Sequence, residues 1–147
     1  MSRRGKGQQG SAAVEFALSF VLLFSVLAGV FQFGYAYYIY NTLETAVRGA
    51  SRYASLRVYD SATATPSAGY LSAVRNMVVY GNPSGSGQVV APGLTPENVS
   101  ITVVMERKIP VQITVAISSY TVNAAIRSFT LVNKPMVTFP FMGRFAP

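Results

Sequence analysis

The stretch that decides the fold is residues 10–57, GSAAVEFALSFVLLFSVLAGVFQFGYAYYIYNTLETAVRGASRYASLR. It carries no charge from Phe16 to Leu43. The run from Phe16 to Tyr38, about 23 residues at 1.5 Å each, spans roughly 34 Å, enough to cross a hydrocarbon core of about 30 Å. A buried core helix this long and apolar on all sides would need a much larger soluble domain. We therefore predict a transmembrane helix, assigned to residues 11–40.

The two flanks of this helix differ in chemistry. A basic leader, residues 1–10, precedes it and carries Arg3, Arg4 and Lys6. Basic residues without acidic partners favour the cytoplasmic side, and aromatic rings favour the headgroup layer. We expect a cytoplasmic N-terminus and an exported remainder. The tyrosines at the far end are Tyr35, Tyr37, Tyr38 and Tyr40.

The helix is predicted to continue as an amphipathic extension, residues 41–60. This segment has no proline, and its less polar residues recur every three or four positions, the period of one helix face. The result is a single rod from about Ser11 to about Arg57, in which a glycine could mark a bend. The residues of the face are Leu43, Ala46, Val47, Ala50, Tyr53, Ala54 and Arg57, and the glycines are Gly29, Gly34 and Gly49.

Residues 61–147 are predicted to form a small α+β head. A short helix is expected over 68–80, with Gly81 as its stop and with Leu71, Val74, Met77 and Val78 on its apolar face. A loop rich in glycine and proline follows over 81–98.

Alternating apolar residues then predict strands from Val99 to Met105 and from Val111 to Ile117, paired as an antiparallel hairpin. Weaker strands are expected over 128–132 and 136–141, and their order in the sheet stays open. The predicted architecture is a long helix whose amphipathic part packs on a small antiparallel sheet.

The composition argues against several functional classes. The chain has 147 residues, a net charge of +7, no Cys and no His, and its five acidic residues are scattered. Thiol chemistry and the common hydrolytic triads are therefore excluded, and we expect no enzyme activity, no metal site and no cofactor. Three of the twelve basic residues fall in the first six positions, so membrane topology explains much of the excess charge and nucleic-acid binding is not expected.

The N-terminal third resembles a known family. Gly10 ends the leader, Glu15 is the fifth residue after it and Phe16 the sixth, as in type IV prepilins and pseudopilins. SAAVEFAL and FGYAYYIYNTLETAVRGASRYAS, with a short β-rich head, resemble the TadE-like proteins of tight-adherence (Tad/Flp, type IVc) pili. The resemblance covers mainly residues 8–57. Major Flp pilins have almost no head, which places this chain among the minor pilins or pseudopilins.

This resemblance implies a function and a set of partners. A prepilin peptidase would cut after Gly10 and leave Ser11 as the mature N-terminus. The product would be a subunit that initiates, caps or builds a Tad-type pilus used in adhesion or secretion. Its partners would be other pilin or pseudopilin subunits, the peptidase, the inner-membrane pilus assembly platform and the lipid bilayer. The expected location is the bacterial inner membrane, with the head periplasmic, and then the extracellular pilus.

The residues give this motif a physical rationale. A peptidase at the membrane surface needs an extended, uncrowded bond, and Gly10 has no side chain to obstruct it. A carboxylate in hydrocarbon must be neutral or paired, and the natural partner of Glu15 is the N-terminal amine of an adjacent subunit. Glu15 would then set the register of assembly. The alternative is that Glu15 lies among headgroups and stabilises the dipole of its own helix.

Two further features concern packing. Phe16, Phe20 and Phe24 form a ridge that faces either lipid or a neighbouring subunit, and Ser25 with Gly29 would let another backbone approach. Gln32, the one amide in the span, is expected to meet a partner helix or water. The alternative function is an uncleaved single-pass protein that serves as a periplasmic scaffold or binding protein.

Overall fold

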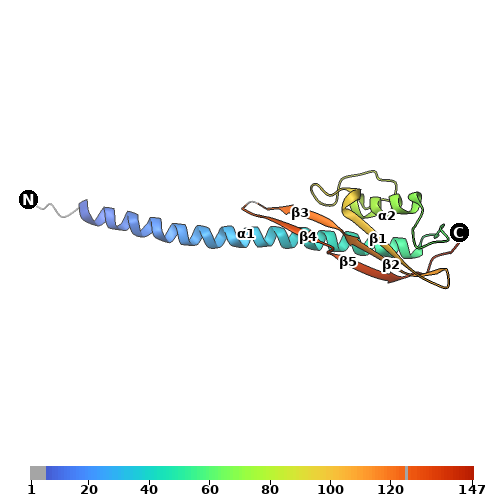
Figure 1. Ribbon diagram of the computed structural model, residues 1–147. Helices are drawn as coiled ribbons and strands as arrows, with labels where there is room; N and C mark the ends of the chain where they lie inside the picture. The colour runs from blue at the N-terminus through green and yellow to red at the C-terminus, as the bar shows by residue number, and fades with distance from the viewer. Residues whose placement is uncertain (1–5, 125) are drawn as a thin grey trace, which may run out of the picture.

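A single helix dominates the computed structural model, which describes residues 6–124 and 126–147. Helix α1 runs from Lys6 to Leu56 without interruption and is roughly 75 Å long. Its first part stands alone, and the head covers its second part (Figure 1). The predicted rod is confirmed, although it begins earlier than Ser11 because the leader next to it contains no helix-breaking proline. None of the three glycines that could have marked a bend, Gly29, Gly34 and Gly49, interrupts the helix.

The head is α+β, as predicted. Three strands form an antiparallel sheet in the order β1-β2-β5, and two more form a separate antiparallel pair, β3-β4. The strands are β1 Val99–Glu106, β2 Ile109–Ile117, β3 Ser119–Asn123, β4 Ser128–Val132 and β5 Met136–Pro140. The predicted hairpin is confirmed as β1-β2. Strand β3 was not predicted, because only the bend at Ser118 separates it from β2.

Helix α2, Ala68–Tyr80, has the predicted bounds and defined caps. The side chain of Ser67 accepts a hydrogen bond from the backbone N–H of Tyr70 at 3.1 Å. Gly81 ends the helix in the left-handed conformation (φ 66°), which glycine adopts without steric cost. The predicted apolar face is partly wrong, because Tyr70, Ala73 and Val79 are buried with Val74 and Val78, while Leu71 and Met77 are half-buried.

The head covers the C-terminal part of α1, which is called the upper part of the helix below. The core forms where this upper part meets α2 and the three-stranded sheet. Four positions of the predicted face of α1 are fully buried: Leu43, Val47, Ala50 and Ala54. They join residues of α2, such as Val74 and Val78, and of β2, such as Ile113, Val115 and Ile117, in one cluster. The short 3-10 helix η1, Pro96–Asn98, leads into β1 beside this cluster. The upper part of α1 is therefore a core element of the head.

The C-terminal segment closes the end of the head. Tyr59 and Phe145 form an isolated parallel β-bridge between their backbones. The ring of Tyr59 also packs edge-on against the ring of Tyr70, with their centroids 5.4 Å apart. A Cβ at Gly143 would collide with the backbone carbonyl of Arg57, so only glycine permits this close approach. The last residues of the chain thus cover the end of α1.

Three tyrosine hydroxyls donate to backbone carbonyls in this head: Tyr59 to Thr63 and Tyr120 to Pro92, both at 2.7 Å, and Tyr70 to Ala54 at 2.6 Å. Burial raises the pKa of each phenol, and the charge of Asp60 adds to the effect at Tyr59. The folded state therefore holds these protons at a pH where the unfolded chain has released them. The stabilisation is complete below about pH 10 and is lost as the pH rises through the folded-state pKa values.

We predict that the ionisation of these tyrosines does not change the stability of the head against urea below about pH 10. Above that pH it lowers the stability. Tyr70→Phe should reduce this alkaline loss, because it removes the phenol whose pKa is raised most. Unfolding of the full chain in detergent, followed by near-ultraviolet circular dichroism, measures the effect. Tyr37→Phe, at an exposed tyrosine, is the control. Equal alkaline loss in the wild type and in Tyr70→Phe would contradict the prediction.

Candidate functional site

The lower segment of α1, residues 11–31, is the most unusual surface of the molecule. Every side chain from Ser11 to Leu27 is exposed, and large apolar residues point in all directions around the helix. Among the described residues, α1 is the one helix long and apolar enough to cross a membrane. A stable monomer in water does not expose a contiguous apolar surface of this extent. The lower segment is a single-pass membrane anchor.

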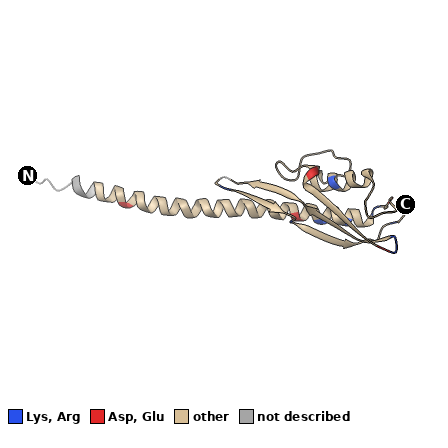
Figure 2. Ribbon diagram, in the orientation of Figure 1, with Lys and Arg blue, Asp and Glu red and all other residues tan. Residues whose placement is uncertain are grey.

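Glu15 is the one charged residue in this segment. Apart from one acidic position, Figure 2 draws the described lower part of α1 in the colour of uncharged residues. The side chain of Glu15 is exposed, one turn above Ser11 on the same helix face. The one ion pair among the described side chains lies elsewhere, between Glu44 and Arg48 at 2.7 Å. The structure therefore presents Glu15 outward from the anchor, where a second molecule can reach it.

The Gly10–Ser11 bond lies inside α1, one turn from the first residue of the helix, Lys6. Gly10 is exposed, and nothing lies within 4 Å of where its Cβ would be. A peptidase that needs an extended bond would have to unwind this first turn, and helix ends open readily. Arg3 and Arg4, the other two basic residues of the leader, lie outside the described residues.

The predicted phenylalanine ridge is present on the lower segment. The rings of Phe16 and Phe20 stack with centroids 6.1 Å apart, and those of Phe20 and Phe24 with centroids 6.0 Å apart. All three rings are exposed. Phe16 and Glu15 are adjacent in sequence and therefore point in different directions on the helix. The lower segment thus offers a carboxylate on one side and an aromatic ridge on another.

Gln32 has a partner that the sequence did not indicate. Its amide Nε2 donates to the backbone carbonyl of Arg127 at 2.6 Å, and its Oε1 accepts from the backbone N–H of Ile126 at 2.9 Å. Only 6% of the residue is exposed. The expected partner helix or water is thus replaced by the connection between β3 and β4 of the same chain. The contact between the rings of Phe33 and Phe129, 6.3 Å apart, reinforces this attachment.

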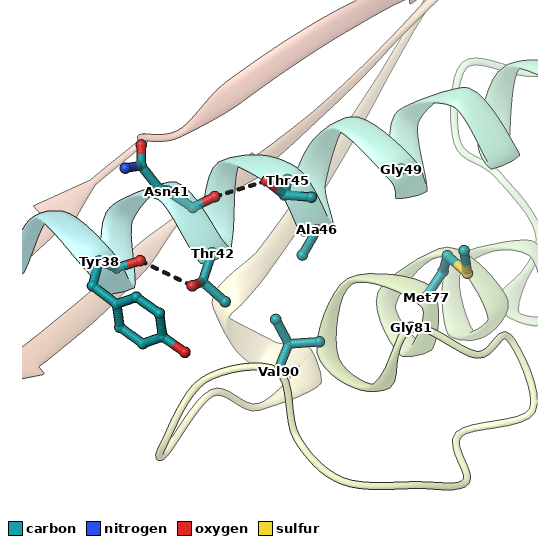
Figure 3. A pocket seen from close by; sticks show the side chains of 9 residues that line it. All are labelled: Tyr38, Asn41, Thr42, Thr45, Ala46, Gly49, Met77, Gly81 and Val90. Atoms are coloured by element: carbon teal, nitrogen blue, oxygen red, sulfur yellow. Dashed lines mark hydrogen bonds between the residues drawn. The ribbon is translucent and has the colours of Figure 1, made fainter.

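The head has a groove of about 520 Å³ between α1, the C-terminal end of α2 and the loop that follows α2 (Figure 3). The hydroxyls of Thr42 and Thr45 donate to the α1 carbonyls of Tyr38 and Asn41, both at 2.9 Å. The groove is therefore mostly apolar and suits a protein side chain better than a polar metabolite. Its lining is Tyr38, Asn41, Thr42, Thr45, Ala46 and Gly49 of α1, with Met77, Gly81 and Val90.

Comparison with known proteins agrees with this geometry. The family model of TadE-like proteins matches residues 10–52, which confirms the resemblance over most of α1. The matched segment contains Gly10, Ser11, Glu15 and Phe16, and the rest of the head lies outside it. No curated protein and no solved structure matches the chain. The match supports a protein associated with a Tad pilus.

Proposed function

We propose that this chain is a pilin-like structural subunit, a minor pilin or pseudopilin, for assembly of a Tad-type pilus used in adhesion or secretion. The observation that carries the proposal is the exposed lower segment of α1 with Glu15 near its end, inside the matched residues 10–52. A simple anchor has no use for a carboxylate in this position. Its placement is suited to pairing with another subunit.

Maturation would create the partner group for that carboxylate. Cleavage after Gly10 removes Arg3, Arg4 and Lys6 and leaves the amine of Ser11 at the start of the helix. In hydrocarbon, the amine of one subunit and Glu15 of the next would neutralise each other, because an isolated charge there is costly. The two helices would be staggered by about one turn or two, so each added subunit would rise by a fixed step.

The proposal also includes orientation and partners. The basic leader would hold the N-terminus in the cytoplasm, where a prepilin peptidase acts, and the head would lie in the periplasm. The inner-membrane assembly platform and other pilin subunits would then bind the lower segment, with the phenylalanine ridge packing between helices. The groove at Tyr38 and Met77 would face neighbouring heads.

A second candidate is an uncleaved anchored scaffold or binding protein of the periplasm. The observation that favours it is the Gly10–Ser11 bond, which lies within α1 and not in an extended segment. Both functions require the same anchor and the same head. They differ in whether the leader, residues 1–10, is cleaved off or retained.

The intact mass of the protein from its own host separates the two candidates. We predict a chain that begins at Ser11 when the prepilin peptidase is present and a full-length chain when it is deleted. Gly10→Val should block cleavage, because its branched side chain crowds the bond. Gly29→Val is a matched control, since it also lies on α1 with open space at its Cβ and should leave processing unchanged. A full-length wild-type chain in the presence of the peptidase would contradict the pilin proposal and favour the scaffold.

A further inference from the structure

The β3-β4 hairpin reaches farther down α1 than any other described part of the head (Figure 1). Gln32 fixes its end through the two backbone hydrogen bonds described above. Ile126, at this end, is 62% exposed and lines an apolar groove together with the lower segment of α1. The apolar surface of the anchor therefore continues onto the hairpin. The other residues of this groove are Phe24, Leu27, Ala28 and Phe31.

The hairpin limits where the outer surface of the membrane can lie. A two-stranded sheet has two open edges, and hydrocarbon cannot satisfy their backbone N–H and C=O groups. If the span ran to residue 40, the hairpin end would be immersed in lipid. The hydrocarbon must therefore end near Phe31. A core of about 30 Å measured downward from there covers about 20 residues and begins near Ser11.

The chemistry of the hairpin end suits this boundary. Ile126 offers an exposed apolar side chain, and the next residue, Arg127, is exposed and cationic. Such a pair can place its apolar member at the edge of the hydrocarbon while the guanidinium reaches lipid phosphates. The side chain of Gln32 already accepts from the backbone N–H of Ile126 and donates to the backbone carbonyl of Arg127, so these two backbone groups reach the membrane surface with a partner.

We propose that Ile126 and Arg127 form a membrane contact, in which Ile126 enters the outer leaflet of the bilayer that holds α1 and Arg127 binds its phosphates. Gln32 is the positioning residue that sets this contact at the upper end of the span. The head would then be held at a fixed height and orientation on the membrane. This inference goes beyond the pilin function and rests only on the membrane anchor.

The absence of cysteine from the sequence permits a direct test of depth. Single variants Ile126→Cys and Val132→Cys of the full chain would be labelled with a fluorophore sensitive to polarity. Nanodiscs of phosphatidylcholine and phosphatidylglycerol, some with nitroxide-bearing lipids as quenchers, would hold the protein. Val132 is a matched control, because it is 61% exposed on the same hairpin and lies roughly 20 Å farther along the strand.

We expect the label at position 126 to emit at shorter wavelength and to be quenched by the lipid nitroxides, while the label at position 132 behaves as in water. Water-like emission at both positions would overturn the proposal. Shielding at position 126 without lipid quenching would also overturn it, because the occupant would then be protein. Lipid quenching at both positions would mean that the whole head lies on the bilayer, and would likewise contradict a contact confined to the hairpin end.

Gln32→Leu tests the positioning role. Combined with Ile126→Cys, it should reduce the lipid quenching, because the hairpin loses both bonds to α1. Asn41→Leu replaces an exposed amide on the same helix and should leave the quenching unchanged. Full quenching in Gln32→Leu would show that Gln32 does not set the contact.

Discussion

Glu15→Ala is expected to insert into the membrane and to lose its leader, yet to be missing from pili. The apolar lower segment of α1 is unchanged by this substitution, so the anchor still forms. The bond between Gly10 and Ser11 is also unchanged. What disappears is the partner of the neighbouring subunit's N-terminal amine. Removing one member of a buried ion pair costs about 3–5 kcal/mol, which corresponds to more than about a hundredfold in each association step.

Glu44→Ala is the matched control for this prediction. Glu44 lies on the same helix but pairs with Arg48 on the surface of the head, where an ion pair contributes about 0.3–0.5 kcal/mol. It should enter pili normally. Immunoblots of sheared pili and of membrane fractions, with the intact mass of each variant, measure insertion, processing and incorporation separately. Normal incorporation of Glu15→Ala would disprove the register role and leave Glu15 as a stabiliser of its own helix dipole.

The parts of the fold that could be predicted from sequence are those with local causes. The rod, α2 and the β1-β2 hairpin follow from periodicities of 3.6 and 2 residues and from a glycine that stops a helix. Strand β3 and its pairing with β4 have no such local cause. The strand is five residues long and is separated from β2 only by a bend, so its partner is chosen by tertiary packing.

The candidate site likewise contains some relations that could be predicted from the sequence and others that could not. Positions along one helix follow from sequence alone, so the relation of Gly10, Ser11, Glu15 and Phe16 was predictable. The partners of Gln32 were not, because Ile126 and Arg127 lie 94 and 95 residues away in the chain. The signal was present only as an amide in an otherwise apolar segment, which indicates a hydrogen-bonding partner without saying which one.

Leu43→Ala is expected to destabilise the head strongly while leaving the protein anchored. Leu43 is fully buried at the centre of the upper part of α1, and removing its side chain leaves a cavity that costs about 2–5 kcal/mol. A domain of this size has a total stability of about 5–15 kcal/mol, so the loss is a large share of it. Hydrogen exchange of the full chain in nanodiscs should show faster exchange in α2 and β2 and unchanged protection in the lower segment of α1.

Leu56→Ala provides the comparison, because Leu56 is on the same helix but is 55% exposed, and its truncation should have little effect. The contrast tests the division of α1 into two parts with different environments. Lipid holds the lower segment whether or not the head is folded, whereas only the head's own core stabilises its packing against the upper part. If Leu43→Ala left the exchange of α2 and β2 unchanged, α1 would not be a core element of the head. If Leu43→Ala also made hydrogen exchange in the lower segment faster, the two parts would unfold as one unit, and the anchor would depend on the head.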